Sequence, residues 1–265
     1  MRIIDVHAHI YPPKIEHKAT QAIGDFYDRP QMLHNGSPEE LLESGRNAGV
    51  TDFLVFSTAT TPHQVESING FIIRQCREHP EFVGAGTLHI DFTDYEKEID
   101  RMYAAGLKGV KFHPDFQKFR IDDEKLFPMY EKLQSKDMFV ITHSGDPRYD
   151  FSHPERVARV AKNFPRMRVI AAHFGGWMSW DIARGCLRNL PNVYYDTSST
   201  YGFGGLEPMK LGFRAFDNTH IFFGCDFPMW DHAIELKTLD MLGLDEQTME
   251  NVLFNNFADF YGLEK

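Results

Sequence analysis

Short, predominantly apolar runs recur along the whole chain and alternate with segments whose apolar residues repeat at helical spacing. The runs cover residues 3–6, 53–56, 82–85, 107–112, 138–142, 169–172, 193–195 and 221–223. Runs that are continuous, rather than apolar at every second position, are typical of strands buried on both faces of a parallel sheet. The pattern therefore predicts eight parallel strands, each followed by a helix or a loop.

Helix signals lie between these runs. Ser37-Pro38-Glu39-Glu40 and Thr61-Pro62-His63-Gln64 each combine a capping box with proline at the first helical position, and Thr93-Asp94-Tyr95-Glu96 forms a third box. Two apolar stripes at helical spacing follow, one made of Leu126, Met129, Tyr130 and Leu133, the other of Val157, Val160, Ala161 and Phe164. Strands and helices are therefore expected to alternate through the chain.

This alternation predicts the fold class. A chain of 265 residues is close to the ~250 that are typical of a (β/α)8 barrel, so we expect an α/β protein with a single TIM barrel of parallel strands and outer helices. A doubly wound open sheet is less favoured, because His7-Ala8-His9 follows the first strand where that fold has a glycine-rich turn. No repeat, low-complexity tract or linker divides the sequence. We therefore expect one domain over residues 1–265.

The interval between the first two predicted strands is longer than the others. Residues 3 and 53 are 50 positions apart, whereas residues 53 and 83 are 30 apart. The excess lies in Tyr11 to Gly36, on the side where strands leave the barrel and where barrel enzymes have their active sites. Two interpretations stay open with equal weight: a lid or substrate wall, and a surface excursion.

Charge and composition exclude several classes of protein. The chain has 28 Lys and Arg against 38 Asp and Glu, a net charge of −10, which argues against nucleic-acid binding through bulk charge. No apolar run approaches the ~20 residues of a membrane helix, and Met1-Arg2-Ile3-Ile4-Asp5 lacks a signal-peptide core. Cys76, Cys186 and Cys225 are too few and too scattered for a disulfide framework. A cytoplasmic protein without membrane or nucleic-acid partners is expected.

Polar side chains stand where most of the predicted strands end. They are His7, His9, Lys111, His113, His143, His173, Asp196 and Asp226. Because the carboxyl ends of parallel strands meet at one rim of a barrel, we expect these side chains to converge. His7 and His9 share a face because alternate residues of a strand do, so both can bind one ion. Imidazole suits Zn, Fe, Ni or Mn, and a carboxylate from a facing strand completes a site with a position open for water.

Other interpretations apply to several of these residues. A single histidine at a strand end is more often a hydrogen-bonded packing residue than a ligand, and His89 after the third strand fits that description. Lys111 has three candidate roles: pairing with an acid, which we prefer, a modified metal bridge, or a contact to a substrate carboxylate. Seven further histidines are expected to be structural or solvated: His17, His34, His63, His79, His153, His220 and His232.

An ordered set of motifs carries a family resemblance. It comprises residues 4–9, 109–114, 142–145, 172–176, 195–199, 223–228 and 255–262, and it spans nearly the whole chain. With this set the chain resembles the amidohydrolase superfamily. Within the superfamily it is most similar to the branch of small metal-dependent hydrolases and decarboxylases that includes aminocarboxymuconate-semialdehyde decarboxylase.

The resemblance implies a divalent metal at the mouth of the barrel, held by His7, His9, His143 and Asp226. Zinc is the preferred ion, with manganese, iron and nickel as alternatives. His173 then corresponds to the active-site base or, in binuclear relatives, to a ligand of a second ion. The best-known binuclear members have an acid or a modified lysine on strand four, where this chain has Lys111 and His113. One metal is therefore expected, with two kept open.

The function predicted from these residues is that of a metal-dependent hydrolase, which cleaves an amide, ester or lactone bond in a small molecule. Asp226 would take a proton from the attacking water, and His173 would stabilise the oxyanion or protonate the leaving group.

Two alternatives keep the same residues. One is a decarboxylase or hydratase of an unsaturated carboxylic acid, for which Arg148 is a candidate to hold the carboxylate, with Lys111 and His113 as further substrate contacts. The other is a barrel that binds a metal or ligand without turnover. A pocket with a metal and Lys111 would be cationic, so an anionic substrate is compatible with an acidic protein. Aromatic residues such as Phe203 and Phe213 are expected in the core, with a homodimer surface as the alternative.

Overall fold

The computed structural model describes residues 2–29 and 32–264, and in this part of the chain eight strands form one sheet in sequence order. The strands are β1 (Ile4–His9), β2 (Asp52–Phe56), β3 (Phe82–Thr87), β4 (Gly109–Phe112), β5 (Phe139–Thr142), β6 (Val169–Ala171), β7 (Val193–Asp196) and β8 (Ile221–Phe222). All neighbouring strands run parallel. Each predicted apolar run overlaps one strand, so the predicted (β/α)8 barrel is confirmed.

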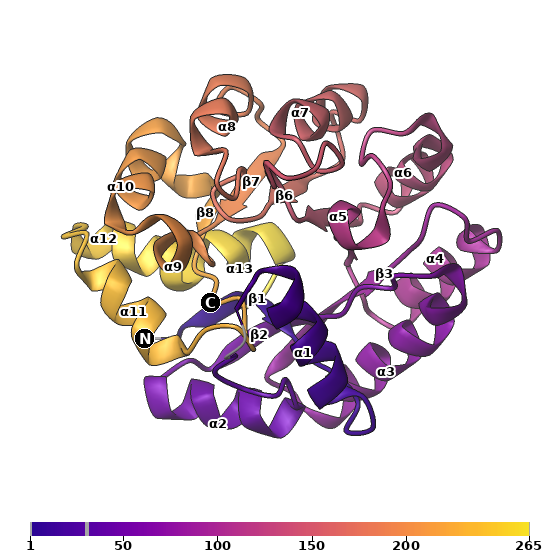
Figure 1. Cartoon of the computed structure of the whole chain (residues 1–265), viewed down its shortest axis with the longest axis horizontal. Coiled ribbons are helices and arrows are strands. Elements are labelled where there is room, and N and C mark those ends of the chain that lie inside the picture. Colours follow the sequence, from indigo (N-terminus) through magenta and orange to yellow (C-terminus); the bar gives the residue numbers. More distant parts are fainter. Residues whose placement is uncertain (1, 30–31, 265) are drawn as a thin grey trace.

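Helices surround the strands, and Figure 1 shows them as an outer ring with α1 lying inside it. The α-helices are α1 (Glu16–Phe26), α2 (Pro38–Ala48), α3 (Val65–Glu78), α4 (Tyr95–Ala104), α5 (Pro114–Gln117), α6 (Phe127–Ser135), α7 (Pro154–Asn163), α8 (Trp180–Cys186), α9 (Thr200–Gly204), α10 (Leu206–Ala215), α11 (His232–Asp240), α12 (Glu246–Glu250) and α13 (Asn256–Tyr261). Short 3-10 segments cover η1 (Pro62–Gln64), η2 (Glu124–Leu126) and η3 (Asn218–His220), and η4 (Asn251–Asn255) is a π-helical turn. None of the helices in the described residues has the length and apolar content needed to cross a bilayer.

Two of the three predicted helix starts are correct, and the box at Thr61 and Gln64 is formed, whereas the one at Ser37 is only partly formed. Ser37 Oγ accepts a hydrogen bond from the Glu40 amide at 3.1 Å, while the Glu40 carboxylate bonds to Asn35 instead of closing the box. The third box is wrong. Helix α4 begins at Tyr95 with Asp94 as its N-cap, one residue later than the box requires, so the third helical position is Lys97 and not an acid.

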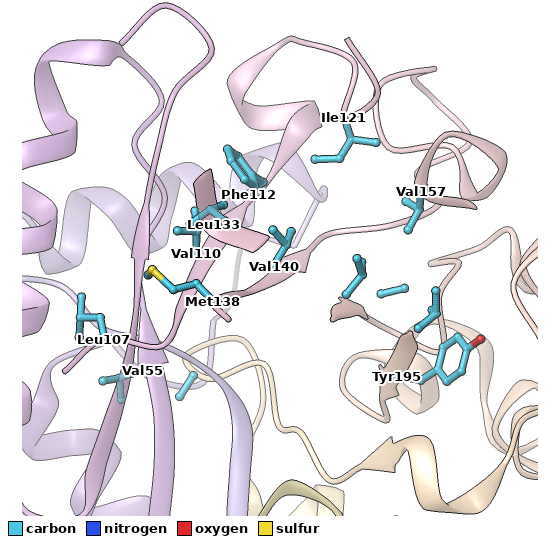
Figure 2. Close-up of a cluster of buried hydrophobic side chains, with 14 of the residues drawn as sticks. Val55, Leu107, Val110, Phe112, Ile121, Leu133, Met138, Val140, Val157 and Tyr195 are labelled. Atoms are coloured by element: carbon cyan, nitrogen blue, oxygen red, sulfur yellow. The ribbon is translucent and has the colours of Figure 1, made fainter. Parts of the chain in front are cut away.

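Two apolar clusters build the barrel. The outer cluster packs the outward faces of the strands against the helices, and Figure 2 shows part of it, with Val110 and Val140 of neighbouring strands beside Leu133 of α6. The inner cluster fills the barrel with inward residues such as Leu54 and Ile141, and with aromatic side chains of the C-terminal segment: Phe254, Phe257, Phe260 and Tyr261. The C-terminal segment therefore closes one end of the barrel and leaves the other end for a pocket.

Aromatic residues that could have formed a dimer surface lie in the core. Phe216, Phe222, Phe223 and Phe227 are buried, and Phe203 and Phe213 are half-buried against the outer cluster.

Strand β1 contains a bulge that determines where its histidines point. Ile4 and Val6 belong to the inner cluster, so strict alternation would turn His7 outward. The register against β2 shifts by one residue between Asp5 and Ala8, and the extra residue brings both His7 and His9 into the mouth of the barrel. The prediction that His7 and His9 face the same way is therefore confirmed.

The seam between β1 and β8 is held by backbone hydrogen bonds and by a buried carboxylate. Amides of Val6, His9 and Asp226 donate across the seam to carbonyls of Phe223, Phe227 and His7. Asp5 points to the outer side, where its Oδ1 accepts from the His7 and Cys225 amides, each at 2.8 Å. Its Oδ2 lies 3.0 Å from His232 Nε2, which makes His232 a structural histidine as predicted.

Candidate active site

A cavity lies at the carboxyl ends of the strands. It is lined by His7, His9, Ile23, Tyr27, Met32, Lys111, His113, Phe116, His143, His173, Asp226, Pro228 and Met229. The lining includes every residue predicted as a metal ligand, catalytic group or substrate contact except Arg148; Asp196, also expected at the rim, is outside the lining and contacts His7. Ile23, Tyr27 and Met32 come from the long segment between β1 and α2, so this segment forms a wall of the pocket, although its residues 30 and 31 lie outside the described part.

Two histidines and one carboxylate of this rim have the arrangement of a metal site. Asp226 Oδ1 lies 3.4 Å from His7 Nε2 and 3.6 Å from His9 Nε2. Single ligand atoms of the three residues lie within 4.8 Å of one another, and both imidazoles are buried. Imidazole and carboxylate donors that converge on one point suit a divalent transition metal. The described residues therefore fit the predicted ion.

Neighbouring side chains orient these donors. His7 Nδ1 lies 2.9 Å from Asp196 Oδ2, so a proton on Nδ1 leaves the Nε2 lone pair directed at the site. Ser199 Oγ donates to Asp226 Oδ2 at 2.5 Å and accepts from Trp230 Nε1 at 2.8 Å. One carboxylate oxygen of Asp226 is thus held by the protein, and the other faces the histidines.

His143 and His173 form a second pair beside this group. His143 Nδ1 lies 3.1 Å from His173 Nε2, and the rings of His7 and His173 stack at 4.9 Å. His173 Nδ1 lies 3.0 Å from the Ser198 carbonyl oxygen, to which it can only donate, so Nε2 is the nitrogen that faces the cavity. Of the four predicted ligands, three share one group, and His143 adjoins it through His173.

Left-handed backbone conformations occur along the same rim. His173, Ser199 and Asp226 have φ values of 60°, 56° and 65°, which side chains other than glycine rarely adopt. Such strain persists where the surrounding structure enforces it, most often at binding and catalytic sites.

Burial disfavours the charged form of four imidazoles of the cavity. It lowers the pKa values of His7, His9, His113 and His143 well below the usual value, and the positive charge of Lys111 lowers them further. Neutral imidazole is the form that binds metals. The cavity is therefore prepared for a cation at neutral pH.

Lys111 donates to an imidazole instead of pairing with an acid. Its Nζ lies 3.0 Å from His7 Nε2 and 4.7 Å from the centre of the Phe56 ring, and within the described residues no carboxylate lies within 4 Å of it. Burial lowers the pKa of Lys111 to about 8, while Asp226 and Asp196 oppose that effect. Lys111 therefore remains mostly protonated at pH 7.

The other two predicted substrate contacts differ from each other. His113 faces the cavity, with Nε2 2.9 Å from the Tyr27 hydroxyl, and its ring stacks on His143 at 4.3 Å. Arg148 is outside the cavity lining, because its guanidinium donates to both oxygens of Asp146 and to the Phe26 carbonyl oxygen. Arg148 thus attaches α1 to the loop after β5.

Several residues of the site were not assigned a role from the sequence. Asp196, Ser198 and Ser199 belong to the motif at the end of β7, so their position was a usable signal. Tyr27 lies in the segment Tyr11 to Gly36, which was expected as a candidate substrate wall, but the sequence did not single it out. Asp115 was not assigned a role, because it reaches the site from the short helix α5, whose path the apolar pattern does not determine. His89 accepts from the Asp91 amide at 3.2 Å, which agrees with the expected capping role.

Comparison with solved structures confirms the architecture. The chain aligns with 5-carboxyvanillate decarboxylase from Sphingomonas paucimobilis over 99% of both chains, with TM-score 0.78 and 15% identity. A dihydroxybenzoic acid decarboxylase from Polaromonas sp. JS666, solved with manganese and the inhibitor 2-nitroresorcinol, aligns with TM-score 0.76 and 12% identity, over 99% of this chain and 97% of the other. A probable 2-pyrone-4,6-dicarboxylic acid hydrolase from Acinetobacter baumannii, solved with citric acid bound, aligns with TM-score 0.74 and 14% identity, over 99% of this chain and 100% of the other. Because these structures are only 12–15% identical to the chain, the alignments establish the fold alone.

Sequence comparison establishes the family. No curated protein matches the chain. The profile of the amidohydrolase family matches residues 4–263, which include every residue of the cavity described above. The chain therefore belongs to the amidohydrolase family.

Proposed function

We propose that the protein is a metal-dependent hydrolase that cleaves an amide, ester or lactone bond in a small molecule. The observation that supports this most directly is the position of Asp226. One oxygen of its carboxylate faces His7 and His9, the other is held by Ser199, and His173 lines the same cavity. The residues proposed to hold the metal and the two proposed to transfer protons thus line the same pocket.

His7, His9 and Asp226 would hold the ion, with His143 as a further ligand through Nδ1. Zinc is the preferred ion, and manganese, iron and nickel suit the same donors. A bound divalent ion lowers the pKa of water towards ~7 and polarises a substrate carbonyl. The manganese in the Polaromonas decarboxylase is in keeping with a divalent ion in this fold.

The side chains of the protein then move the protons. Asp226 Oδ1 accepts a proton from the attacking water, because Ser199 already occupies Oδ2. His173 Nε2 takes up a proton and delivers it to the leaving group, while the Ser198 carbonyl holds Nδ1 and keeps the ring aligned. Positioned acid and base groups of this kind contribute ~10²–10⁴-fold each.

Charge and shape of the cavity favour a small, partly apolar substrate with a negative group. Lys111 is the cation that lines the cavity among the described residues, and Ile23, Met32, Phe116 and Met229 supply apolar walls. The carboxylated compounds in the names of the aligned structures have this chemistry.

Decarboxylation of an unsaturated carboxylic acid is the second candidate. Lys111 provides a charge for the carboxylate, and two of the aligned structures are decarboxylases. Arg148 gives no support, because Asp146 and the Phe26 carbonyl occupy its guanidinium. We place hydrolysis first because Asp226 and His173 provide both proton transfers that it requires.

A screen in labelled water tests the proposal. Protein is stripped with a chelator, reloaded with zinc or manganese, and incubated in H₂¹⁸O with lactones, amides, esters and carboxylated aromatic compounds. Hydrolysis puts one ¹⁸O atom into the acid product, whereas decarboxylation releases CO₂. Asp226→Ala and His173→Asn are expected to lower turnover at least ~10²-fold, while Asp122→Asn, which changes a buried carboxylate paired with Arg156, keeps it. Turnover that needs neither metal nor Asp226 would refute the proposal.

A further inference from the structure

Two neighbouring side chains behind the cavity are buried, and each has one polar atom without a partner. Asp115 on α5 and His143 after β5 have side chains that are 0% and 2% exposed. Among the described residues, Asp115 Oδ1 and His143 Nε2 have no hydrogen-bond partner. The distance from Asp115 Oδ2 to His143 Nε2 is 3.9 Å, slightly longer than a hydrogen bond.

The two unpartnered atoms are complementary. His143 directs Nδ1 at His173 in the cavity and Nε2 at Asp115. A neutral imidazole has one proton, so a lone pair on Nδ1 for the site puts the proton on Nε2. That proton needs an acceptor, because a buried donor without one destabilises the structure. The Asp115 carboxyl group is the acceptor at hand: Oδ2 lies 3.9 Å from Nε2, and Oδ1 has no donor among the described residues.

We propose that Asp115 is a positioning residue for His143: its carboxyl group accepts the Nε2 proton and so keeps the Nδ1 lone pair directed into the cavity. The inference rests on the proposed function, in which His143 is a metal ligand. It assigns a role to a residue outside the cavity lining.

The surroundings fix Asp115 in this position. Ser152 Oγ donates to Asp115 Oδ2 at 2.6 Å, and the Ser152 carbonyl accepts from the Gly145 amide at 2.8 Å. The His113 ring stacks on His143 with a tilt of 6°, which restricts rotation of the imidazole. The anchored carboxylate of Asp115 and the stacked ring of His113 together restrict the His143 imidazole to one orientation.

A separate cation site at this place is less favourable. Asp115, His143 and Asp146 each have a ligand atom within 4.8 Å of the others. Both oxygens of Asp146, however, already accept hydrogen bonds from Arg148. The Arg148 guanidinium supplies the positive charge that Asp146 requires. Asp115 is therefore the carboxyl group available to accept a proton from His143 Nε2.

Zinc affinity is the first test. Competition with a chromophoric chelator measures the zinc dissociation constant of the wild type, Asp115→Ala and Asp115→Asn. We expect the dissociation constant to be ~10–100-fold larger for Asp115→Ala, as for other residues that orient metal ligands. The increase should be smaller for Asp115→Asn, whose amide oxygen can still accept the His143 proton. Asp122→Asn is the matched control, because its buried carboxylate pairs with Arg156 and Arg159, away from His143. It should lose stability and keep the wild-type zinc affinity.

Nitrogen-15 spectra of the histidine rings provide a readout that does not depend on activity or affinity. In zinc-loaded protein the His143 Nε2 proton should exchange slowly with water in the wild type and at least ~10-fold faster in Asp115→Ala, since the buried hydrogen bond is lost. If zinc binds and Asp115→Ala leaves both affinity and exchange unchanged, Asp115 does not position His143, while the proposed function stands. If the wild type binds none of zinc, manganese, iron and nickel, both proposals fail.

Discussion

Glu235 on α11 is a buried carboxyl group that the structure penalises when it ionises. Its side chain is 2% exposed, and Oε1 has no hydrogen-bond partner in the described residues. Burial, assisted by the charges of Asp226 and Asp5, raises the pKa of Glu235 from 4.5 to about 8. Replacement by glutamine keeps the shape and removes the ionisation, so Glu235→Gln isolates this effect.

The sign and size of the effect follow from proton linkage. Between pH 4.5 and about 8 the folded protein binds this proton more tightly than the unfolded chain, so the free energy of unfolding falls as pH rises through that window. At ~1.4 kcal/mol per pH unit, the whole shift amounts to about 5 kcal/mol. About 3 kcal/mol of it falls between pH 5 and pH 8.

Urea unfolding of metal-free wild type and Glu235→Gln at pH 5, 6, 7 and 8 measures this difference. The variant should gain about 3 kcal/mol relative to the wild type from pH 5 to pH 8, because the other titrating groups are shared and cancel. An amide N–H without an acceptor would shift the variant by a constant amount at every pH, so only the slope is decisive. If the difference in free energy of unfolding between the variant and the wild type stays the same from pH 5 to pH 8, Glu235 is not desolvated in the folded state.

Further predictions concern the metal site and the barrel interior. Zinc should raise the melting temperature of the wild type but not of His9→Ala, as measured by calorimetry, and an equal rise in the variant would remove His9 from the ligand set. Asp196→Asn should weaken zinc binding ~10–100-fold in a chelator competition, since His7 Nδ1 loses its charged partner; unchanged affinity would contradict this. Phe257→Ala should lower the free energy of unfolding by about 3–5 kcal/mol in urea titrations, because its buried ring fills the closed end of the barrel, while zinc affinity should stay at the wild-type value.

The strands and the rim could be predicted from the sequence for a definite physical reason. Strands buried on both faces need continuous apolar runs, so each run marked a strand. The strand ends of a parallel barrel meet at one rim, so polar residues such as His7, His143 and Asp226 had to converge. Both inferences need the spacing of residues along the chain and nothing about distant contacts.

Other features depend on contacts that spacing does not encode. The bulge in β1 exists only in the pairing with β2, yet it decides that His7 points inward. Tyr27 reaches His113 because Arg148 and the Phe26 carbonyl attach α1 to the loop after β5. Lys111 was expected to pair with an acid, but its ammonium lies deep in the cavity, where a neutral imidazole is the nearest acceptor.

The charge of the cavity gives an order to the binding events that we propose. Burial disfavours the charged forms of His7, His9, His113 and His143, which leaves the carboxylate of Asp226 and the ammonium of Lys111 in the lining. Without an ion these two charges sum to 0, so the cavity offers an anionic substrate no net attraction. A divalent ion changes the local sum to +2. Metal binding should therefore precede substrate binding. A carboxylated ligand should bind the metal-free protein weakly, and because salt screens buried charges little, this should hold over a range of ionic strengths.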